Sequence, residues 1–300
     1  MPLTYLRRFR VRHYECDAYG HLNNVNYLRY MQEATIEASA AAGYDTARYA
    51  ALGYHWLVRE TEIEYLHPLV YGDTVEVKTW VADFRRVRSR RAYELRSLAT
   101  GELSARGMTD WVYLNTATGE PAIIPGEMIL AFVPEGAPPA TPRQPRREKV
   151  PPPPPGVFRQ LRRVRFQDVD PAQHVNNAVY LAYAEDCGFQ VAAAFGWPAA
   201  RMTAEGFAIV PRRHRVVHTG QAVLDDEVEI ATWVTDVRRA TGARHYALTR
   251  VSDGTPLAEI HTLYVWVDRD TLRPIRIPSH FLADFAANIS SDATAKDTSA

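Results

Sequence analysis

Two helix-like stretches, each followed by strand-like segments, dominate the hydrophobic pattern of this 300-residue chain. Apolar residues recur at helical spacing from Val25 to Ile36, among many alanines, and residues 3–14 before them alternate apolar with basic side chains. Period-two alternation then predicts strands at about 56–66, 74–84, 89–98 and 106–115. A strand, a long helix and four further strands predict an α+β pair of layers.

The same pattern occurs twice, at a constant offset of 153 residues, which separates His21 from His174. Residues 11–34 are identical to residues 164–187 at nine of 24 positions. The offset also pairs Gly53 with Gly206, Asp73 with Asp226, Trp80 with Trp233, Arg91 with Arg244 and Pro125 with Pro278. The chain is therefore predicted to hold two copies of one folding unit.

Prolines separate the two copies. Ten of the 20 prolines lie in residues 134–156, a composition that is typical of an extended, semi-rigid spacer. We therefore predict an N-terminal domain over residues 1–133, a linker over 134–156 and a C-terminal domain over 157–283. Residues 284–300 are small and polar, and we expect them to form a disordered tail.

Composition limits the classes of function. The 35 Lys and Arg residues balance the 35 Asp and Glu residues, which argues against a dedicated nucleic-acid binder. The two cysteines, Cys16 and Cys187, fall at different places in the two copies, so we expect no disulfide framework and a cytoplasmic location. No apolar run approaches the roughly 18 residues that a membrane span needs. The histidines do not cluster with cysteines at metal-binding spacing, and we expect no metal.

Each copy contains a short motif just before its predicted helix. An aspartate lies four residues before a histidine, two asparagines follow, and the helical pattern begins. A carboxylate, an imidazole and a helix N-terminus that lie close together can activate water and polarise a carbonyl group. The predicted catalytic residues are Asp17, His21, Asp170 and His174. As alternatives, the aspartates can turn the chain and the histidines can fix the loop.

Other residues in and beyond the motif are candidates for contacts with a substrate. Amides at the start of each helix can stabilise an oxyanion, and Asn24 is a predicted helix N-cap. Tyr27 and Tyr180, one turn inside the helices, are expected in the core or in a pocket wall. Arg91 and Arg244 suit phosphates or an acidic protein surface, and can alternatively protect a strand edge. The candidate substrate-binding residues are Asn23, Asn24, Tyr27, Arg91, Asn176, Asn177, Tyr180 and Arg244.

These motifs resemble those of a known family. Val11-Arg12 through Asp17, followed by Gly20-His21-Leu22-Asn23-Asn24, resembles the hot-dog-fold thioesterases of the 4-hydroxybenzoyl-CoA thioesterase type. The second copy, Gln173-His174-Val175-Asn176-Asn177, is similar to acyl-ACP and long-chain acyl-CoA thioesterases. The resemblance implies two tandem hot-dog domains that form an internal pseudo-dimer. In each, a curved antiparallel sheet would wrap a long central helix.

In acyl-ACP thioesterases, the catalytic Asp, Asn and His belong to the second repeat. Asp170 and His174 match this pattern, whereas Ala172 stands at the place of the asparagine. The first copy has Tyr19 at that place, so that neither copy matches fully.

The sequence therefore predicts a cytoplasmic thioesterase of fatty acid metabolism. It would hydrolyse an acyl-CoA or acyl-ACP to a carboxylic acid and a thiol, with Asp as base or nucleophile. Coenzyme A or phosphopantetheine would enter as part of the substrate, and no cofactor is expected. The expected partners are acyl-CoA or acyl carrier protein, with further homo-oligomers possible, and no nucleic acid or membrane span. The alternatives are a non-catalytic acyl-thioester binding module and a hydratase or dehydratase of the same fold.

Overall fold

The computed structural model describes residues 2–135 and 150–290 of the chain. The chain divides into two compact units, Met1–Gln144 and Pro145–Ala300, here called unit 1 and unit 2. This division falls within residues 134–156, the segment predicted as a linker. Residues 136–149 of that segment lie outside the described residues.

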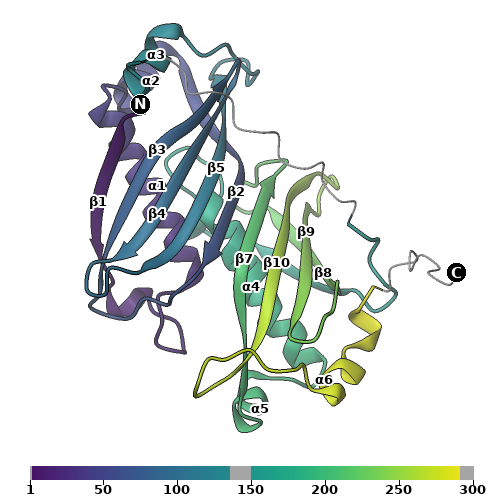
Figure 1. The fold of residues 1–300 in the computed structure, drawn as a ribbon. Helices are drawn as coiled ribbons and strands as arrows, with labels where there is room; N and C mark the ends of the chain where they lie inside the picture. The colour runs from purple at the N-terminus through teal and green to yellow at the C-terminus, as the bar shows by residue number, and fades with distance from the viewer. Residues whose placement is uncertain (1, 136–149, 291–300) are drawn as a thin grey trace, which may run out of the picture. The chain divides into compact units, whose positions relative to one another are not determined.

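Unit 1 is an antiparallel sheet packed against one long helix (Figure 1). The strand order in this unit is β1-β3-β4-β5-β2. The strands are β1 (Thr4–Arg10), β2 (Tyr54–Tyr65), β3 (Thr74–Arg85), β4 (Arg88–Ser97) and β5 (Leu103–Asn115). The helices are α1 (Asn24–Ala41), α2 (Thr46–Leu52) and α3 (Gly126–Phe132), with a 3-10 turn η1 (His13–Glu15) before α1. The predicted long helix and strands are therefore confirmed to within a few residues, whereas α2 and α3 were not predicted.

Unit 2 repeats this arrangement, with the strand order β7-β10-β9-β8-β6. Its strands are β6 (Phe158–Arg163), β7 (Phe207–His218), β8 (Glu227–Thr235), β9 (Thr241–Arg250) and β10 (Pro256–Asp268). Its helices are α4 (Asn177–Ala194), α5 (Ala199–Ala204) and α6 (Ser279–Asp284), with 3-10 turns η2 (Phe166–Asp168) and η3 (Ala286–Asn288). The first strand, the 3-10 turn and the long helix follow one another in both units, so the motif occupies the same place in each.

Small residues allow each long helix to lie close to its sheet. Ala34 of α1 and Ala178 of α4 are fully buried. A Cβ atom added to Gly107 of β5 would lie 2.8 Å from Cε of Met31 in α1, a distance that such atoms essentially never reach. The glycine at this position therefore leaves room for the end of the Met31 side chain, which would have to shift if residue 107 carried a Cβ atom.

The segment after α6 is packed against unit 2. Asn288 is 0 % exposed, and its Nδ2 donates to the carbonyl oxygens of Gly156 (3.1 Å) and Thr232 (2.9 Å). Phe285 is also buried. The predicted disordered tail is therefore wrong for residues 284–290, because a buried ring and a buried amide hold them in place. Residues 291–300 lie outside the described part of the chain.

The last residues of the proline-rich segment also bind to unit 2. Nε1 of Trp233 donates to the carbonyl oxygen of Pro151 at 3.2 Å, and Oγ of Ser290 donates to that of Pro152 at 3.0 Å. The amide of Gly156 donates to the carbonyl oxygen of Ala287 at 3.1 Å. Residues 151–156 were predicted to belong to a spacer, and these hydrogen bonds assign them to the second folding unit instead.

Two buried histidines of unit 2 predict acid sensitivity of its fold. Nδ1 of His214 lies 2.8 Å from Oγ1 of Thr262, and Nδ1 of His245 lies 2.7 Å from Nδ1 of His261. Burial lowers the pKa of His214 from 6.5 to about 3. Burial, with His261 and Arg244 nearby, lowers the pKa of His245 from 6.5 to about 4. The stability that these neutral imidazoles contribute is present above pH 6.5 and is lost as the pH falls toward 4.

We expect the free energy of unfolding to decrease steadily as the pH is lowered from 6.5 to 4. Denaturant titration at several pH values in this range measures the change. Unit 1 has Thr61 and Ala92 at the matching places. The double variant His214→Thr, His245→Ala should therefore flatten the pH dependence, even where the substitutions themselves cost stability. An equally steep dependence in that variant would show that other groups cause it.

Candidate active site

In unit 1, the motif forms a tight loop between η1 and α1. The amide of Asp17 donates to the carbonyl oxygen of His21 at 2.8 Å, and the loop turns at Gly20, whose φ of 81° is in the left-handed region. Oδ1 of Asp17 accepts hydrogen bonds from the amides of Tyr19 (2.8 Å) and His21 (3.3 Å). Among the residues described for this unit, none donates to Oδ2 of Asp17. The backbone therefore fixes the carboxylate of Asp17 through Oδ1.

The loop of unit 2 has the same backbone course with different side chains. The amide of Asp170 donates to the carbonyl oxygen of His174 at 3.1 Å, and Gln173 takes the place of Gly20 with a φ of 66°. This conformation is strained for a residue with a side chain. Oδ1 of Asp170 accepts from the amide of Ala172 at 2.9 Å, and Oδ2 accepts from Nδ2 of Asn176 at 3.3 Å. Both carboxylate oxygens of Asp170 are therefore engaged.

Asparagines cap both long helices, one residue earlier than predicted. Oδ1 of Asn23 accepts from the amide of Val25, and Oδ1 of Asn176 accepts from the amide of Ala178, each at 3.0 Å. The prediction of Asn24 as the N-cap is wrong, because the cap side chain must precede the first helical residue. Asn24 and Asn177 are instead the first residues of α1 and α4. Each 18-residue helix thus directs its positive N-terminal end toward the aspartate loop.

The two motif histidines are half-buried within their loops. The contact of His21 with Asp17 is made by its backbone amide, and His174 contacts Asp170 through its carbonyl oxygen. Among the described residues of each unit, the imidazole ring makes no hydrogen bond to the aspartate of its own loop. The imidazole rings are therefore candidates for contacts with a ligand, and they do not orient the carboxylates here.

The motif tyrosines attach a second loop to each long helix. The hydroxyl of Tyr180 accepts a hydrogen bond from the amide of Ala222 at 2.9 Å. Burial raises the pKa of Tyr27, although a hydrogen bond from the backbone of Leu69 opposes this. Both rings are almost fully buried. Tyr27 and Tyr180 were predicted to lie in the core or in a pocket wall. Their burial supports a place in the core, next to the loops that precede β3 and β8.

Arg91 and Arg244 do not lie with the motif loops. Arg91 pairs with Val81 near the end of β3, whereas the motif end of β3 is marked by the hydrogen bond from the Val11 amide to the Asp73 carbonyl oxygen. The eight residue steps from Asp73 to Val81 span roughly 25 Å of strand. Arg91 is only 5 % exposed, and its guanidinium carbon lies 5.6 Å from the centre of the Phe132 ring.

Arg244 has the corresponding environment in unit 2. Its guanidinium carbon lies 5.6 Å from the centre of the Phe285 ring, and its Nη1 donates to Oδ1 of Asn288 at 3.1 Å. Both arginines are buried core residues, so the alternative of a protected strand edge is not what the structure shows either. Burial lowers the pKa of Arg91.

A buried acid under each motif loop was missed by the sequence analysis. Oε2 of Glu15 accepts a hydrogen bond from the hydroxyl of Tyr30 at 2.6 Å. In unit 2, Oδ2 of Asp168 accepts from the hydroxyl of Tyr183 at 2.7 Å. The backbone carbonyl oxygens of these acids accept hydrogen bonds, each 2.9 Å long, from the amides of the capping asparagines. Each acid therefore connects the loop to the middle of the long helix.

A signal for these acids exists in the sequence. Glu15 and Asp168 lie at the 153-residue offset, two residues before the motif aspartates, and Tyr30 and Tyr183 lie at the same offset. The change from Glu to Asp hides the repetition when only identical residues are compared.

Within residues 2–135 and 150–290, no three His, Cys, Asp or Glu side chains gather as a metal site. No helix in the described ranges combines the length and the apolar character that a bilayer crossing demands.

Two sheet-and-helix units, each with an aspartate loop at the N-terminus of its long helix, define a tandem hot-dog protein. The chain belongs to the thioesterase-like superfamily, whose family profile matches residues 11–160 and 164–285, once in each half. The predicted resemblance and the predicted fold class of two tandem hot-dog domains are thereby confirmed.

Curated relatives and solved structures agree with this assignment. The chain is 27 % identical over 194 residues to an oleoyl-acyl carrier protein thioesterase of Arabidopsis thaliana, covering 60 % of this chain and 54 % of the relative. It is 27 % identical over 191 residues to a dodecanoyl-[acyl-carrier-protein] hydrolase of Umbellularia californica, covering 60 % of this chain and 50 % of the relative. The chain thus spans about half the length of these relatives.

Two solved structures have the same fold over most of the chain. The 12:0-ACP thioesterase from Umbellularia californica superimposes with a TM-score of 0.67 at 21 % identity, covering 87 % of this chain and 93 % of that one. An acyl-ACP thioesterase from Bacteroides thetaiotaomicron also gives 0.67, at 17 % identity, covering 87 % of this chain and 97 % of that one.

Proposed function

We propose that this protein hydrolyses acyl thioesters to a free carboxylic acid and a thiol. The observation that carries the proposal is the motif aspartate, which backbone amides hold at the N-terminus of an 18-residue helix in both units of a thioesterase-like chain. A fixed carboxylate beside a positive helix end combines a proton acceptor with stabilisation of negative charge.

In the proposed reaction, the carboxylate of Asp17 or Asp170 removes a proton from a water molecule, and the resulting hydroxide attacks the thioester carbonyl carbon. The oxyanion of the tetrahedral intermediate faces the amides at the start of α1 or α4. The C–S bond then breaks, and the thiolate leaves and takes up the proton. Direct attack by the carboxylate, which would give an anhydride that water then cleaves, remains the alternative. His21 or His174 would contact the reacting groups.

We propose an acyl carrier protein as the thiol carrier, with coenzyme A as the alternative. The two curated relatives are acyl-carrier-protein thioesterases, and this chain matches each of them over about half its length. Both carriers present the acyl group on a phosphopantetheine arm, so the reaction at the carbonyl carbon is the same for both. No further cofactor enters the proposed mechanism.

The test is the release of free thiol from a panel of acyl-ACP and acyl-CoA substrates of increasing chain length, measured with a thiol reagent. We expect turnover for at least one chain length, with a higher kcat/KM for the carrier-protein form. Binding of acyl thioester without thiol release would favour the non-catalytic module. Consumption of an enoyl thioester without thiol release would favour the hydratase.

A further inference from the structure

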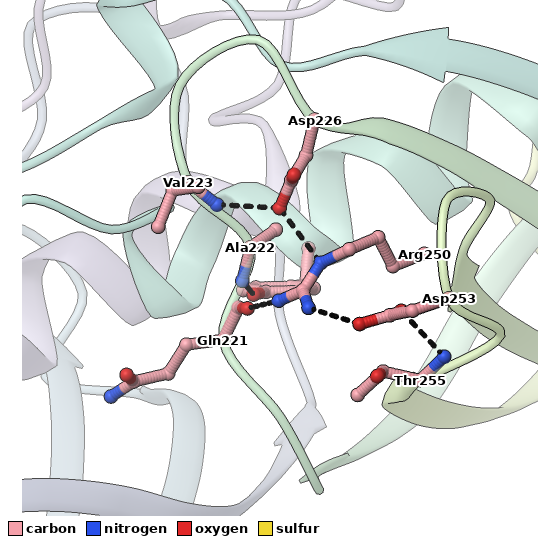
Figure 2. Close-up of polar contacts among 8 residues, drawn as sticks. Gln221, Ala222, Val223, Asp226, Arg250, Asp253 and Thr255 are labelled. Carbon is pink, nitrogen blue, oxygen red and sulfur yellow. Dashed lines mark hydrogen bonds and ion pairs between the residues drawn. The ribbon is translucent and has the colours of Figure 1, made fainter.

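A half-buried guanidinium, that of Arg250, joins three segments of unit 2 (Figure 2). Arg250, the last residue of β9, donates from Nε to Oδ2 of Asp226 at 2.9 Å and from Nη1 to Oδ2 of Asp253 at 2.9 Å. Its Nη2 donates to the carbonyl oxygen of Gln221. Arg250 therefore joins the turn after β9 to both ends of the segment 221–226, which precedes β8 and is here called the β7–β8 loop.

The β7–β8 loop is in direct contact with the motif. Between the two attachment points of Arg250 lies Ala222, whose amide donates to the hydroxyl of Tyr180 in α4 and whose carbonyl oxygen accepts from the amide of Val175 at 2.8 Å. Val175 immediately follows His174 in the motif. Oδ2 of Asp226, which accepts from Arg250, also accepts from the amide of Val223 at 2.9 Å. The position of the motif thus depends, through Ala222, on a loop that Arg250 holds.

Unit 1 carries a different residue at the place of Arg250. Ser97 occupies the place of Arg250, and its Oγ accepts a hydrogen bond from the amide of Thr100, the residue at the place of Asp253. The amide of Leu22 donates to the carbonyl oxygen of Leu69 at 2.7 Å, and a further bridge pairs His21 with Val70. The motif of unit 1 is therefore attached to its neighbouring loop by an additional backbone pairing.

The two motif loops also differ in backbone strain. Gly20 takes its positive φ at no steric cost, whereas Gln173 takes the same region against the clash of its Cβ atom. Gln173 lies two residues before Val175, the residue that bonds to Ala222. Because a strained conformation persists only where its surroundings impose it, the second loop needs an external hold more than the first.

We propose that Arg250 is a positioning residue for the second active site. Its guanidinium fixes the β7–β8 loop, and through Ala222 and Val175 this loop keeps Asp170 in its catalytic orientation. The inference rests on the proposed hydrolase function and adds that the second site contributes to turnover. A side chain with fewer donors leaves the carbonyl oxygen of Gln221 and one carboxylate without their partner, and the loop can then move away from the motif.

The test uses Arg250→Ser, which introduces the residue that unit 1 carries at this place. In an Asp17→Asn background, where turnover comes from the second site alone, we expect kcat for the acyl thioester to fall about 10- to 100-fold with KM changed by less than about twofold, since displacement of a catalytic group acts on the chemical step. In the wild-type background, kcat should fall by the share that the second site contributes. In an Asp170→Asn background, Arg250→Ser should cause no further loss, because both changes then act on one site. Arg250→Lys should recover only part of kcat, since one ammonium group cannot reach three acceptors.

A matched control separates positioning from general loss of charge on this loop. Arg163→Ser removes an exposed ion pair with Asp225 in the same loop and should leave kcat unchanged. Amide hydrogen exchange of the full chain provides a readout independent of activity. In Arg250→Ser, the amides of Ala222 and Val175 should exchange faster, and the amide of Leu22 in unit 1 should exchange as in the wild type.

The outcomes distinguish this proposal from the proposed function. Equal loss of kcat in the Asp170→Asn background, an unchanged kcat in folded Arg250→Ser, or unchanged exchange at Val175 would each overturn the positioning role while the hydrolase function stands. A wild-type protein that releases no thiol from any acyl thioester would instead overturn the hydrolase function, and the catalytic role of Arg250 with it.

Discussion

Replacement of both motif aspartates, by Asp17→Asn together with Asp170→Asn, is expected to lower kcat by about two orders of magnitude or more, in line with the usual effect of a general base. The amide retains the shape of the side chain, and its carbonyl oxygen can still accept the hydrogen bonds that Oδ1 receives from the backbone in each loop. In unit 2, the new amide group loses the 3.3 Å hydrogen bond that Oδ2 of Asp170 accepts from Nδ2 of Asn176, whereas the backbone hydrogen bonds that fix each loop stay and the proton acceptor is lost. Initial rates of thiol release under saturating substrate measure this effect.

The two single variants show which unit contributes to turnover. Each should lose the share of kcat that belongs to its own unit, and the double variant should lose both. Asp270→Asn, a substitution in an exposed turn outside the motifs, serves as the control and should leave the rate unchanged. Wild-type turnover in the double variant would remove both aspartates from the mechanism.

Loss of the buried acid under the second loop should have the largest effect on stability. Asp168→Ala removes the acceptor for the hydroxyl of Tyr183 and for the amide of Arg165, which lies 2.9 Å from Oδ2. Because buried donors without partners are costly, we expect the free energy of unfolding to fall by about 2–4 kcal/mol. Urea titration monitored by circular dichroism measures this change.

Two comparisons make that result specific. Tyr183→Phe removes one donor and leaves the acid in place, so it should cost about 1 kcal/mol. Arg163→Ala removes an exposed ion pair with Asp225 and should change stability by less than about 0.5 kcal/mol. If Asp168→Ala were no more destabilising than Arg163→Ala, the acid would have no structural role.

The sequence predicted the elements of the fold well because their patterns are strong. The alternation of Val75 and Val77 with polar residues places one face of β3 in the core, and both valines are fully buried. The exact start of the long helix was harder to predict, because Asn23 and Asn24 are equally good capping residues and only the backbone conformation distinguishes them. The short helices α2 and α3 have too few turns to show a periodicity.

The candidate site was predicted in part. The motif residues do gather at the helix N-termini, since they are close in the sequence and one loop brings them together. Arg91 and Arg244 were misplaced because arginine is usually exposed, and their burial depends on aromatic rings about 40 residues away in the chain. The contacts of Arg250 could not be foreseen, because its partners lie on other loops and Ser97 breaks the repetition in the first copy.

The hydrogen bonds that join Gly156 to Ala287 and Asn288 place the beginning and the end of unit 2 next to each other. A polypeptide whose two ends meet tolerates reconnection in a new order, provided that the new break lies in an exposed turn. A short peptide from residue 290 to residue 150, with new termini near Asp270, should therefore give a circularly permuted second unit. In such a molecule, Asn288 would stay buried, and the former ends of the unit would be joined to each other instead of to the rest of the chain.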